Sequence, residues 1–176
     1  MKTDYTDNFS ELQNAFDTIS RHIVDARVDL GRDIFHFVSS LTPIVNVDLL
    51  IKNEFGETIL TWRSDEFYGP GWHLPGGVVR FKEDPKKRVY KVALSELGCE
   101  VQFDQNPLTV RSQVTDERDV RGHFISLLYH CKTTTPPDIS RRADLRKPLN
   151  GQWSWHRYAP ENLLPVHDSF RKFING

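Results

Sequence analysis

Apolar residues near the start of the chain recur at helical spacing. Polar side chains lie between them, so a helix over this segment would carry one apolar face and one solvated face. The apolar face consists of Phe9, Leu12, Phe16, Ile19, Ile23 and Ala26. We expect this face to be covered either by the rest of the chain, as a lid, or by a second copy of the chain in a homodimer.

The pattern then changes to short apolar runs and alternation, which are typical of strands. A short helix or turn is predicted over Asp33–Ser40, and a hairpin joins a strand ending at Ile51 to a second strand over Thr58–Arg63. Further strands are predicted from Val101 toward Val114, over His123–Cys131 and over Gln152–Tyr158. The middle of the chain is therefore expected to be mainly β-structure.

Two helices are predicted among and after these strands. Asp84 and Pro85 suit the N-cap and the first position of a helix, and Gly98 suits its end. The other helix is predicted over Asn162–Ile174. The order of strands, helix, strands, helix predicts an α+β domain over residues 30–176, preceded by a helical extension over residues 1–29.

The amino-acid composition of the chain limits the kinds of ligand that it could bind. The 23 basic and 24 acidic residues leave a formal net charge of -1, so no strong overall field attracts nucleic acid or an anionic membrane. No apolar run approaches the ~20 residues that a transmembrane helix needs. We therefore expect a small phosphorylated ligand, held by local positive charge, and neither nucleic acid nor membrane as a partner.

Cysteine usage bears on the compartment. The chain has two cysteines, Cys99 and Cys131, and no CxxC pair. The first residues do not resemble a signal peptide. We expect two reduced thiols in a cytoplasmic protein.

The candidate chemistry lies around a pair of glycines and the helix that follows them. Gly76 and Gly77 would let the backbone approach a ligand closely. Glu96 lies near the end of the helix and could direct its carboxylate at the same point. A divalent cation held there would bridge the oxygens of a diphosphate and neutralise its developing charge.

The spacing of this segment resembles the Nudix box. In that motif a glycine is followed by five residues, a glutamate, seven residues, and then Arg-Glu-apolar-x-Glu-Glu-x-Gly-apolar. Gly77, Glu83, Glu96 and Gly98 are in register with it. Three positions depart from the motif, since Lys91 replaces Arg, and Val92 and Ser95 replace glutamates. The resemblance implies a Nudix fold, a mixed sheet sandwiched between helices, with the N-terminal helix as an addition.

Within the Nudix hydrolases the chain resembles the GDP-mannose mannosyl hydrolases. That resemblance runs from about Leu30 to Phe173, and its clearest segments are the entry to the first strand over residues 37–48, the reduced box ending Ala93-Leu94-Ser95-Glu96-Leu97-Gly98, and Val166-His167. It implies a hydrolase in which water attacks the sugar's anomeric carbon and the nucleoside diphosphate leaves. It further implies an Mg²⁺ or Mn²⁺ ion held by Glu96 and the Gly77 carbonyl, with Asp48 and Arg63 binding the nucleotide-sugar substrate.

Two departures from that family leave roles to be reassigned. The family's Arg after the glycine pair is Val78 here, and Arg80 is our substitute for binding and catalysis, because it would share one face of an extended segment. The family's loop before the last strand carries a metal-binding Gln and a basic His, whereas residues 148–152 hold no His. We rank His123 first as the replacement base, and Gln152 could take a ligand role.

Glu83 is expected to be structural, pairing with Lys91 or with the start of the helix. Two other functions stay open from the sequence. One is a Nudix hydrolase that attacks phosphorus and cleaves the phosphoanhydride, which the loss of carboxylates at Val92 and Ser95 disfavours. The other is a nucleotide-sugar-binding module with little or no catalysis.

Overall fold

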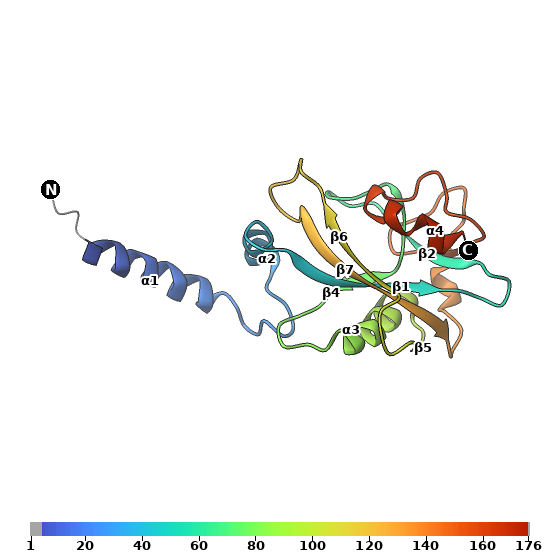
Figure 1. Cartoon of the computed structure of the whole chain (residues 1–176), viewed down its shortest axis with the longest axis horizontal. Helices are drawn as coiled ribbons and strands as arrows, with labels where there is room; N and C mark the ends of the chain where they lie inside the picture. Colours follow the sequence, from blue (N-terminus) through green and yellow to red (C-terminus); the bar gives the residue numbers. More distant parts are fainter. Residues whose placement is uncertain (1–4, 176) are drawn as a thin grey trace.

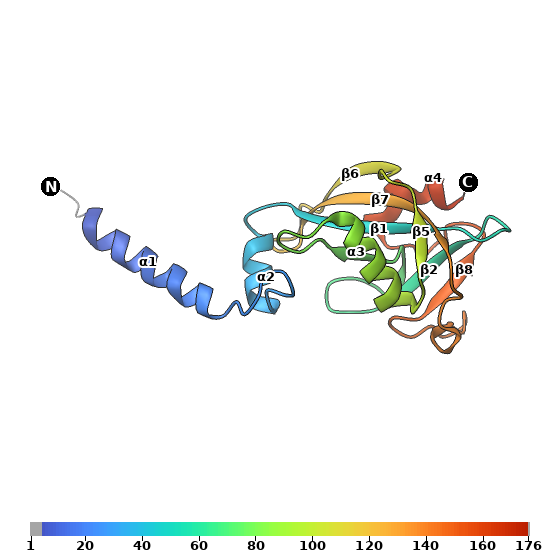
Figure 2. The ribbon, with the colours of Figure 1, turned by 90° about the horizontal axis from the view of Figure 1, so that it is seen from below.

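The structure is a computed structural model that describes residues 5–175. Two β-sheets lie at its centre, with helices on both sides (Figures 1 and 2). The larger sheet consists of β1 (Ile44–Ile51), β4 (Gly76–Val78), β5 (Val101–Phe103), β6 (Thr109–Val114) and β7 (His123–Thr133). The smaller sheet consists of β2 (Thr58–Arg63), β3 (Gly71–His73) and β8 (Trp153–His156). The expected α+β class with a mixed sheet between helices is confirmed.

β1 is the central strand of the larger sheet. It pairs in parallel with β7 along its whole length and antiparallel with β4 at its beginning. Both faces of β1 are buried, because Val47, Leu49 and Ile51 pack toward one apolar cluster and Leu50 packs toward another. Asp48 shares the face of Leu50 and is 2% exposed. A carboxylate in this position must find polar partners inside the protein.

The two apolar clusters lie on opposite sides of β1. One side is covered by α3 (Pro85–Val92) and the π-helical turn η1 (Ala93–Leu97). The other is covered by the 3₁₀ helix η3 (Pro165–Phe170) and α4 (Arg171–Ile174), as Figure 1 shows. The helix predicted over Asn162–Ile174 is therefore shorter than expected and mostly 3₁₀.

Local signals in the sequence place α3 as predicted. The side chain of Asp84 accepts a hydrogen bond from the backbone N–H of Lys86 at 2.9 Å, and Pro85 occupies the first turn. Gly98 ends the following turn with φ 64°, a left-handed conformation that glycine adopts without steric cost. η1 continues α3 without a break, and a π-helical turn of this kind is often found at a functional site.

Glu83 pairs with two cations in front of this helix, so its expected structural role is confirmed. Its carboxylate lies 2.9 Å from Lys91 Nζ and 2.6 Å from Arg88 Nη2, with the Glu83 side chain only 6% exposed. Burial by itself would raise the pKa of Glu83, but hydrogen bonds from Lys91, the Arg80 backbone and Arg88 lower it to about 2.

Replacing Glu83 by Gln should lower the free energy of unfolding by about 2 kcal/mol at neutral pH, because two cations lose their partner. Since the native pKa is depressed, this stabilisation is complete above the unfolded value near 4.5 and is lost as the pH falls toward 2. Urea unfolding of wild type and variant at several pH values measures the difference. The matched control is Glu54→Gln, at an exposed position of the β1–β2 turn, which should change little.

The strand predicted from Val101 toward Val114 is divided in the structure. β5 pairs with the end of β7, and β6 pairs with its beginning, with Asp104–Leu108 between them. The long β7 thus serves as the partner of two shorter strands on one side. The segment between β5 and β6 is not a strand, because β5 and β6 pair with different stretches of β7.

α1 (Tyr5–Arg21) extends away from the sheets, while α2 (Arg32–Ser39) packs close to them (Figures 1 and 2). Phe9, Leu12 and Phe16 on α1 are each more than half exposed. The described part of the chain does not fold α1 back as a lid. A search of residues 5–175 finds no helix with the length and hydropathy needed to span a membrane.

Candidate functional site

A cavity of about 770 Å³ opens between the two sheets. Its walls come from β1, β2, β4, η1, the loop before β8 and the start of η3. The polar residues that line it include Asn46, Asp48, Thr61, Arg63, Asp65, His73, Glu96, Gln113, Arg121, Gln152 and His167. The size is typical of a site for a small ligand. Four residues predicted for the site, Asp48, Arg63, Gly77 and Glu96, line this one cavity.

Glu96 meets the glycine pair at the inner end of the cavity. The backbone N–H of Gly76 donates to one oxygen of Glu96 at 3.3 Å, and the hydroxyl of Thr61 donates to the other at 3.3 Å. Both bonds are long. Burial raises the pKa of Glu96 to about 7, against the lowering effect of these donors and of Arg63. The carboxylate is therefore poorly compensated by the protein itself.

Both glycines are required by close packing. A Cβ at Gly76 would lie 2.5 Å from an Asp48 carboxylate oxygen and 2.9 Å from the carbonyl oxygen of Val47. A Cβ at Gly77 would lie 2.8 Å from a methyl carbon of Val92. Val92, which replaces a glutamate of the Nudix box, is thus a packing residue against Gly77.

Asp48 is surrounded by three side-chain donors. Ser126 on β7 donates to it, Asn46 donates at 3.1 Å, and His167 Nε2 lies 3.4 Å away. His167 Nδ1 accepts the backbone N–H of Leu74 at 2.9 Å, so the proton of the neutral ring is on Nε2, facing Asp48. This network holds Asp48 at the cavity wall and joins β1 to η3.

His73 lies on the side of the cavity formed by the smaller sheet. Its Nδ1 donates to the Leu74 carbonyl at 2.7 Å, and its Nε2 is 3.0 Å from the Thr61 hydroxyl. Burial, together with the neighbouring His167 and Arg63 side chains, lowers the pKa of His73 to about 3. His73 is therefore a neutral imidazole whose Nε2 can only accept, and the single hydroxyl hydrogen of Thr61 faces either this nitrogen or Glu96.

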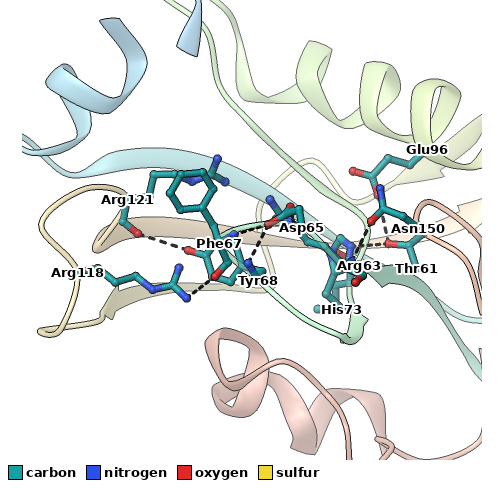
Figure 3. A network of polar contacts seen from close by, with 12 residues as sticks. Thr61, Arg63, Asp65, Phe67, Tyr68, His73, Glu96, Arg118, Arg121 and Asn150 are labelled. Atoms are coloured by element: carbon teal, nitrogen blue, oxygen red, sulfur yellow. Dashed lines mark hydrogen bonds and ion pairs between the residues drawn. The ribbon is translucent and has the colours of Figure 1, made fainter. Parts of the chain in front are cut away.

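Arg63 lies farther out along the cavity, at the end of β2. Its guanidinium forms an ion pair with Asp65 and lies 4.6 Å from the centre of the Tyr68 ring. Asp65 also accepts the backbone N–H groups of Phe67 and Tyr68 at 2.8 Å each, which shapes the loop between β2 and β3. Figure 3 shows this network, with Glu96 and Thr61 at one end and Arg118 and Arg121 at the other.

Two residues proposed for the site lie outside this cavity. His123 begins β7 and its Nε2 is 2.9 Å from the hydroxyl of Ser112 on β6. Its neighbour Phe124 lines the cavity, and successive side chains of a strand point to opposite faces, so His123 points away. Arg80 lines a smaller, second cavity and forms an ion pair with Asp29 at 3.1 Å. Arg80 lies beyond the end of β4, so the alternation of side chains along an extended strand no longer applies to it.

The loop before β8 contributes backbone and amide groups. Gln152 lines the cavity, and its side-chain oxygen accepts the backbone N–H of Leu149 at 2.9 Å. The Asn150 side chain accepts the backbone N–H of Ser64 at 2.9 Å, which ties the loop to the end of β2. This loop therefore forms a fixed wall of the cavity next to Arg63.

A divalent cation fits the corner between Gly77 and Glu96 on chemical grounds. Within residues 5–175 no group of three or more His, Cys, Asp or Glu side chains could hold a metal by itself. Mg²⁺, however, is commonly bound by one or two carboxylates, with water and substrate phosphates completing its shell. The partly buried Glu96 carboxylate, with only two long hydrogen bonds, would gain from such a cation.

Several polar residues of the cavity were not singled out from the sequence. Thr61 lines the cavity and Ser126 bonds Asp48 behind its wall, and both lie in strands whose alternation marks them only as inward-facing or outward-facing. The sequence gives no reason to prefer His73 over the other histidines. The available signal for Thr61 and Ser126 is a polar residue within an otherwise apolar strand, which needs a polar partner once it is buried.

Comparisons with known proteins extend over most of the fold. No protein-family model matches the chain. The "Low-salt glycan biosynthesis protein Agl8" of Haloferax volcanii is 33% identical over 101 residues, which make up 55% of this chain and 64% of that protein. The matched part thus spans less than two thirds of the length of this curated relative.

Solved structures of Nudix hydrolases are similar in fold. The MutT protein from Methanosarcina mazei Go1 has a TM-score of 0.56 and 23% identity, covering 76% of this chain and 92% of that one. A UDP-X diphosphatase has a TM-score of 0.57 and 14% identity, covering 99% of this chain and 82% of that one. A MutT NUDIX hydrolase from Burkholderia pseudomallei has a TM-score of 0.54 and 18% identity, with 76% and 96% covered. The chain therefore has the mixed α+β fold of the Nudix hydrolases.

Proposed function

We propose that this protein is a metal-assisted hydrolase of a nucleoside diphosphate sugar, which releases the nucleoside diphosphate by substitution at the anomeric carbon. The single observation that carries the proposal is the corner where Glu96 meets the glycine pair, with Arg63 on the same cavity. This corner supplies one carboxylate for a cation and one guanidinium for a diphosphate. We place the protein nearest to the GDP-mannose mannosyl hydrolases, because they share its reduced box.

A single metal ion suits substitution at the anomeric carbon better than it suits attack at phosphorus. A standard Nudix box presents several carboxylates, but Val92 is buried against Gly77, and Ser95 donates its hydroxyl to the Val92 carbonyl. A bound divalent cation, Mg²⁺ or Mn²⁺, would supply positive charge to the leaving diphosphate. Glu96 would hold it, and Arg63 would bind a diphosphate oxygen as an always-charged donor.

The reaction itself can be balanced with groups of the cavity. The water oxygen forms a bond to the anomeric carbon, the bond from that carbon to the diphosphate oxygen breaks, and its electron pair stays on the diphosphate. The water proton passes to solvent or to the leaving group. Because the pKa of His73 is lowered to about 3 and His167 uses both ring nitrogens within the protein, neither is a strong base, and stabilisation of the leaving group carries most of the catalysis in this scheme.

The end of the cavity near Glu96 and the end near Arg121 offer different groups to the sugar and the nucleoside of a substrate. Thr61 offers a hydroxyl close to Glu96, whereas the far end of the cavity holds Arg121 beside Arg63. We propose cytoplasmic action on a free small molecule, without nucleic acid or membrane as partner. We further propose that the exposed apolar face of α1 forms contacts in a homodimer, since it is uncovered within the described chain.

A product assay tests the proposal. The protein is incubated with Mg²⁺ and with GDP-mannose, GDP-glucose or UDP-glucose, and the products are resolved by NMR. Nucleoside diphosphate with a free sugar of inverted configuration is expected. Nucleoside monophosphate with sugar phosphate would replace the proposal with phosphoanhydride cleavage, the activity that the name of the similar UDP-X diphosphatase suggests. Tight binding without any product would indicate a binding module.

Metal binding should depend on pH through Glu96. Because burial raises the pKa of Glu96 to about 7, the carboxyl is mostly protonated below that pH and competes poorly for a cation. The ionised fraction rises from roughly one tenth at about pH 6 to nine tenths at about pH 8, so Mg²⁺ affinity should rise about ten-fold between them. Calorimetric titration with Mg²⁺ measures this. An affinity that does not change with pH would remove Glu96 from the metal site.

A further inference from the structure

Three arginines gather around one aromatic ring at the outer end of the cavity. The guanidinium carbons of Arg63, Arg118 and Arg121 lie 4.6, 4.2 and 5.6 Å from the centre of the Tyr68 ring. Arg118 and Arg121 come from the loop between β6 and β7, far along the chain from Arg63. Figure 3 shows them clustered away from Glu96, at the opposite end of the polar network.

The positive charge of this cluster is not balanced by the protein. Asp65 forms its ion pair with Arg63, and within residues 5–175 neither Arg118 nor Arg121 has a carboxylate at ion-pair distance. Arg118 donates to the Phe67 carbonyl through Nη2, but its Nη1 is buried without an acceptor. Nε of Arg121 is likewise buried without an acceptor. Buried donors of this kind require an acceptor from elsewhere.

Aromatic rings hold both guanidinium groups while leaving donors free. Arg121 lies 4.9 Å from the centre of the Phe67 ring and 5.5 Å from that of Phe35, in addition to Tyr68. Its backbone N–H donates to the Ser39 hydroxyl at 3.0 Å, which anchors the loop to α2. Aromatic rings attract the cation without using its N–H groups. Those groups stay available for an oxyanion, which a guanidinium binds through two parallel hydrogen bonds.

Two of the three arginines, Arg63 and Arg121, line the same cavity as the catalytic corner, and Arg118 lies behind them against the Tyr68 ring. Arg121 lines that cavity together with Arg63, Asp48 and Glu96. Burial, followed by the positive charge of Arg63, lowers the pKa of Arg121, which is the expected consequence of cations held together without an anion. A ligand whose diphosphate reaches Glu96 and Arg63 can extend toward Arg121.

We propose that Arg118 and Arg121, beside Arg63, form an oxyanion subsite that binds a second anionic group of the substrate, separate from the diphosphate that is hydrolysed. This rests on the proposed function for the identity of the diphosphate site. The oxyanion is either a carboxylate on the sugar, as in a nucleoside diphosphate hexuronate, or a further phosphate on the nucleotide. Both present the planar or tetrahedral oxygens that a pair of guanidinium groups recognises.

Equilibrium binding of matched ligands tests this subsite. Affinities are measured by calorimetry in EDTA, in which the metal-assisted reaction does not run. UDP-glucose is compared with UDP-glucuronate, GDP-mannose with GDP-mannuronate, and GDP with GTP. We expect the wild-type protein to bind the member with the additional oxyanion at least about ten-fold more tightly in one of the two classes, carboxylate or phosphate, as for a charge-assisted contact.

Variants identify the residues responsible. Arg121→Gln and Arg118→Gln should each abolish most of that preference while changing the affinity for the ligand without the additional oxyanion by less than about two-fold. Arg157→Gln is the matched control, because Arg157 is exposed after β8 and does not line the cavity. Melting temperatures identify a variant that does not fold. If one arginine variant fails to fold, the ligand preference of the other variant tests the subsite.

The outcomes separate this proposal from the proposed function. Three results would each overturn the subsite. The wild-type protein could show no preference for the additional oxyanion in either class, or the preference could survive both arginine variants. The third is an equal loss of affinity for both members of a ligand pair. Hydrolysis of nucleotide sugars whose sugar is uncharged, without any binding preference for an additional oxyanion, would leave the proposed function and remove the subsite. A clear preference without any hydrolysis would do the reverse.

Discussion

Replacing Glu96 by Gln is expected to lower kcat/KM for a nucleoside diphosphate sugar by roughly 10³-fold, equivalent to ~4 kcal/mol of transition-state stabilisation. Glu96 is the carboxylate at the glycine corner, and the neighbouring box positions are occupied by Val92 and Ser95, which cannot replace it. The amide would accept the hydrogen bond from Gly76 as the carboxylate does, so the fold is preserved. Steady-state kinetics over a range of Mg²⁺ concentrations measures the loss.

The stability of this variant distinguishes a chemical effect from unfolding. Because burial raises the pKa of Glu96, the neutral form is favoured in the folded protein, and the stability it confers is lost as the pH rises through about 7. Glu96→Gln should therefore be as stable as wild type below about pH 4.5, where the carboxyl is protonated in both states, and more stable above pH 7 in the absence of metal. Glu100→Gln, at an exposed position just after Gly98, is the control for kinetics. Unchanged turnover in Glu96→Gln would refute the metal site.

Replacing Gly76 by Ala should lower the free energy of unfolding by about 3 kcal/mol, the upper end of the range for overpacking. The added methyl would stand 2.5 Å from an Asp48 oxygen and 2.9 Å from the Val47 carbonyl. Backbone cannot move aside as a flexible side chain can, and displacing Asp48 would break its contacts with Ser126 and His167. Urea unfolding measures the loss, and the variant should also lose nucleotide-sugar binding.

Gly77 offers a matched comparison for this effect. A methyl there meets only the Val92 side chain at 2.8 Å among close contacts, so Gly77→Ala should cost less than Gly76→Ala. In a Val92→Ala background the added methyl at Gly77 has room, and the double variant should cost less than the two single changes together. No such compensation is expected for Gly76→Ala. Equal costs at both glycines would show that crowding against Asp48 does not govern the bend.

Much of the candidate site followed from short-range patterns. The Gly76-Gly77 pair and Glu96 are separated by one loop and one helix, whose start at Asp84 and end at Gly98 are encoded locally. Once the helix is placed, its length sets where Glu96 comes to lie relative to the glycines. Asp48 was assigned to the substrate site from the family resemblance, and the structure places it 2% exposed with three donors around it.

Other parts of the site depend on strand register and on the path of loops. His123 and Phe124 are adjacent in sequence, but only Phe124 lines the cavity, because the pairing of β7 with β1 decides which face of the strand turns inward. Arg80 leaves the cavity because β4 ends at Val78. Neither outcome is encoded in the residues themselves. A shift of β7 by one position would exchange the faces of His123 and Phe124, and the position of Arg80 depends on where β4 ends.

From its sequence alone, this protein is recognisable as an α+β domain with a glycine bend, a capped helix and a carboxylate near the end of that helix, because these depend on neighbouring residues. Only the tertiary structure brought Ser126 and His167 to Asp48, Thr61 to Glu96, and Arg118 and Arg121 to Tyr68. These partners are far apart along the chain. Their contacts arise when distant strands pair and when the helices, loops and two sheets pack together, and no local pattern of apolar and polar residues specifies which side chains then meet.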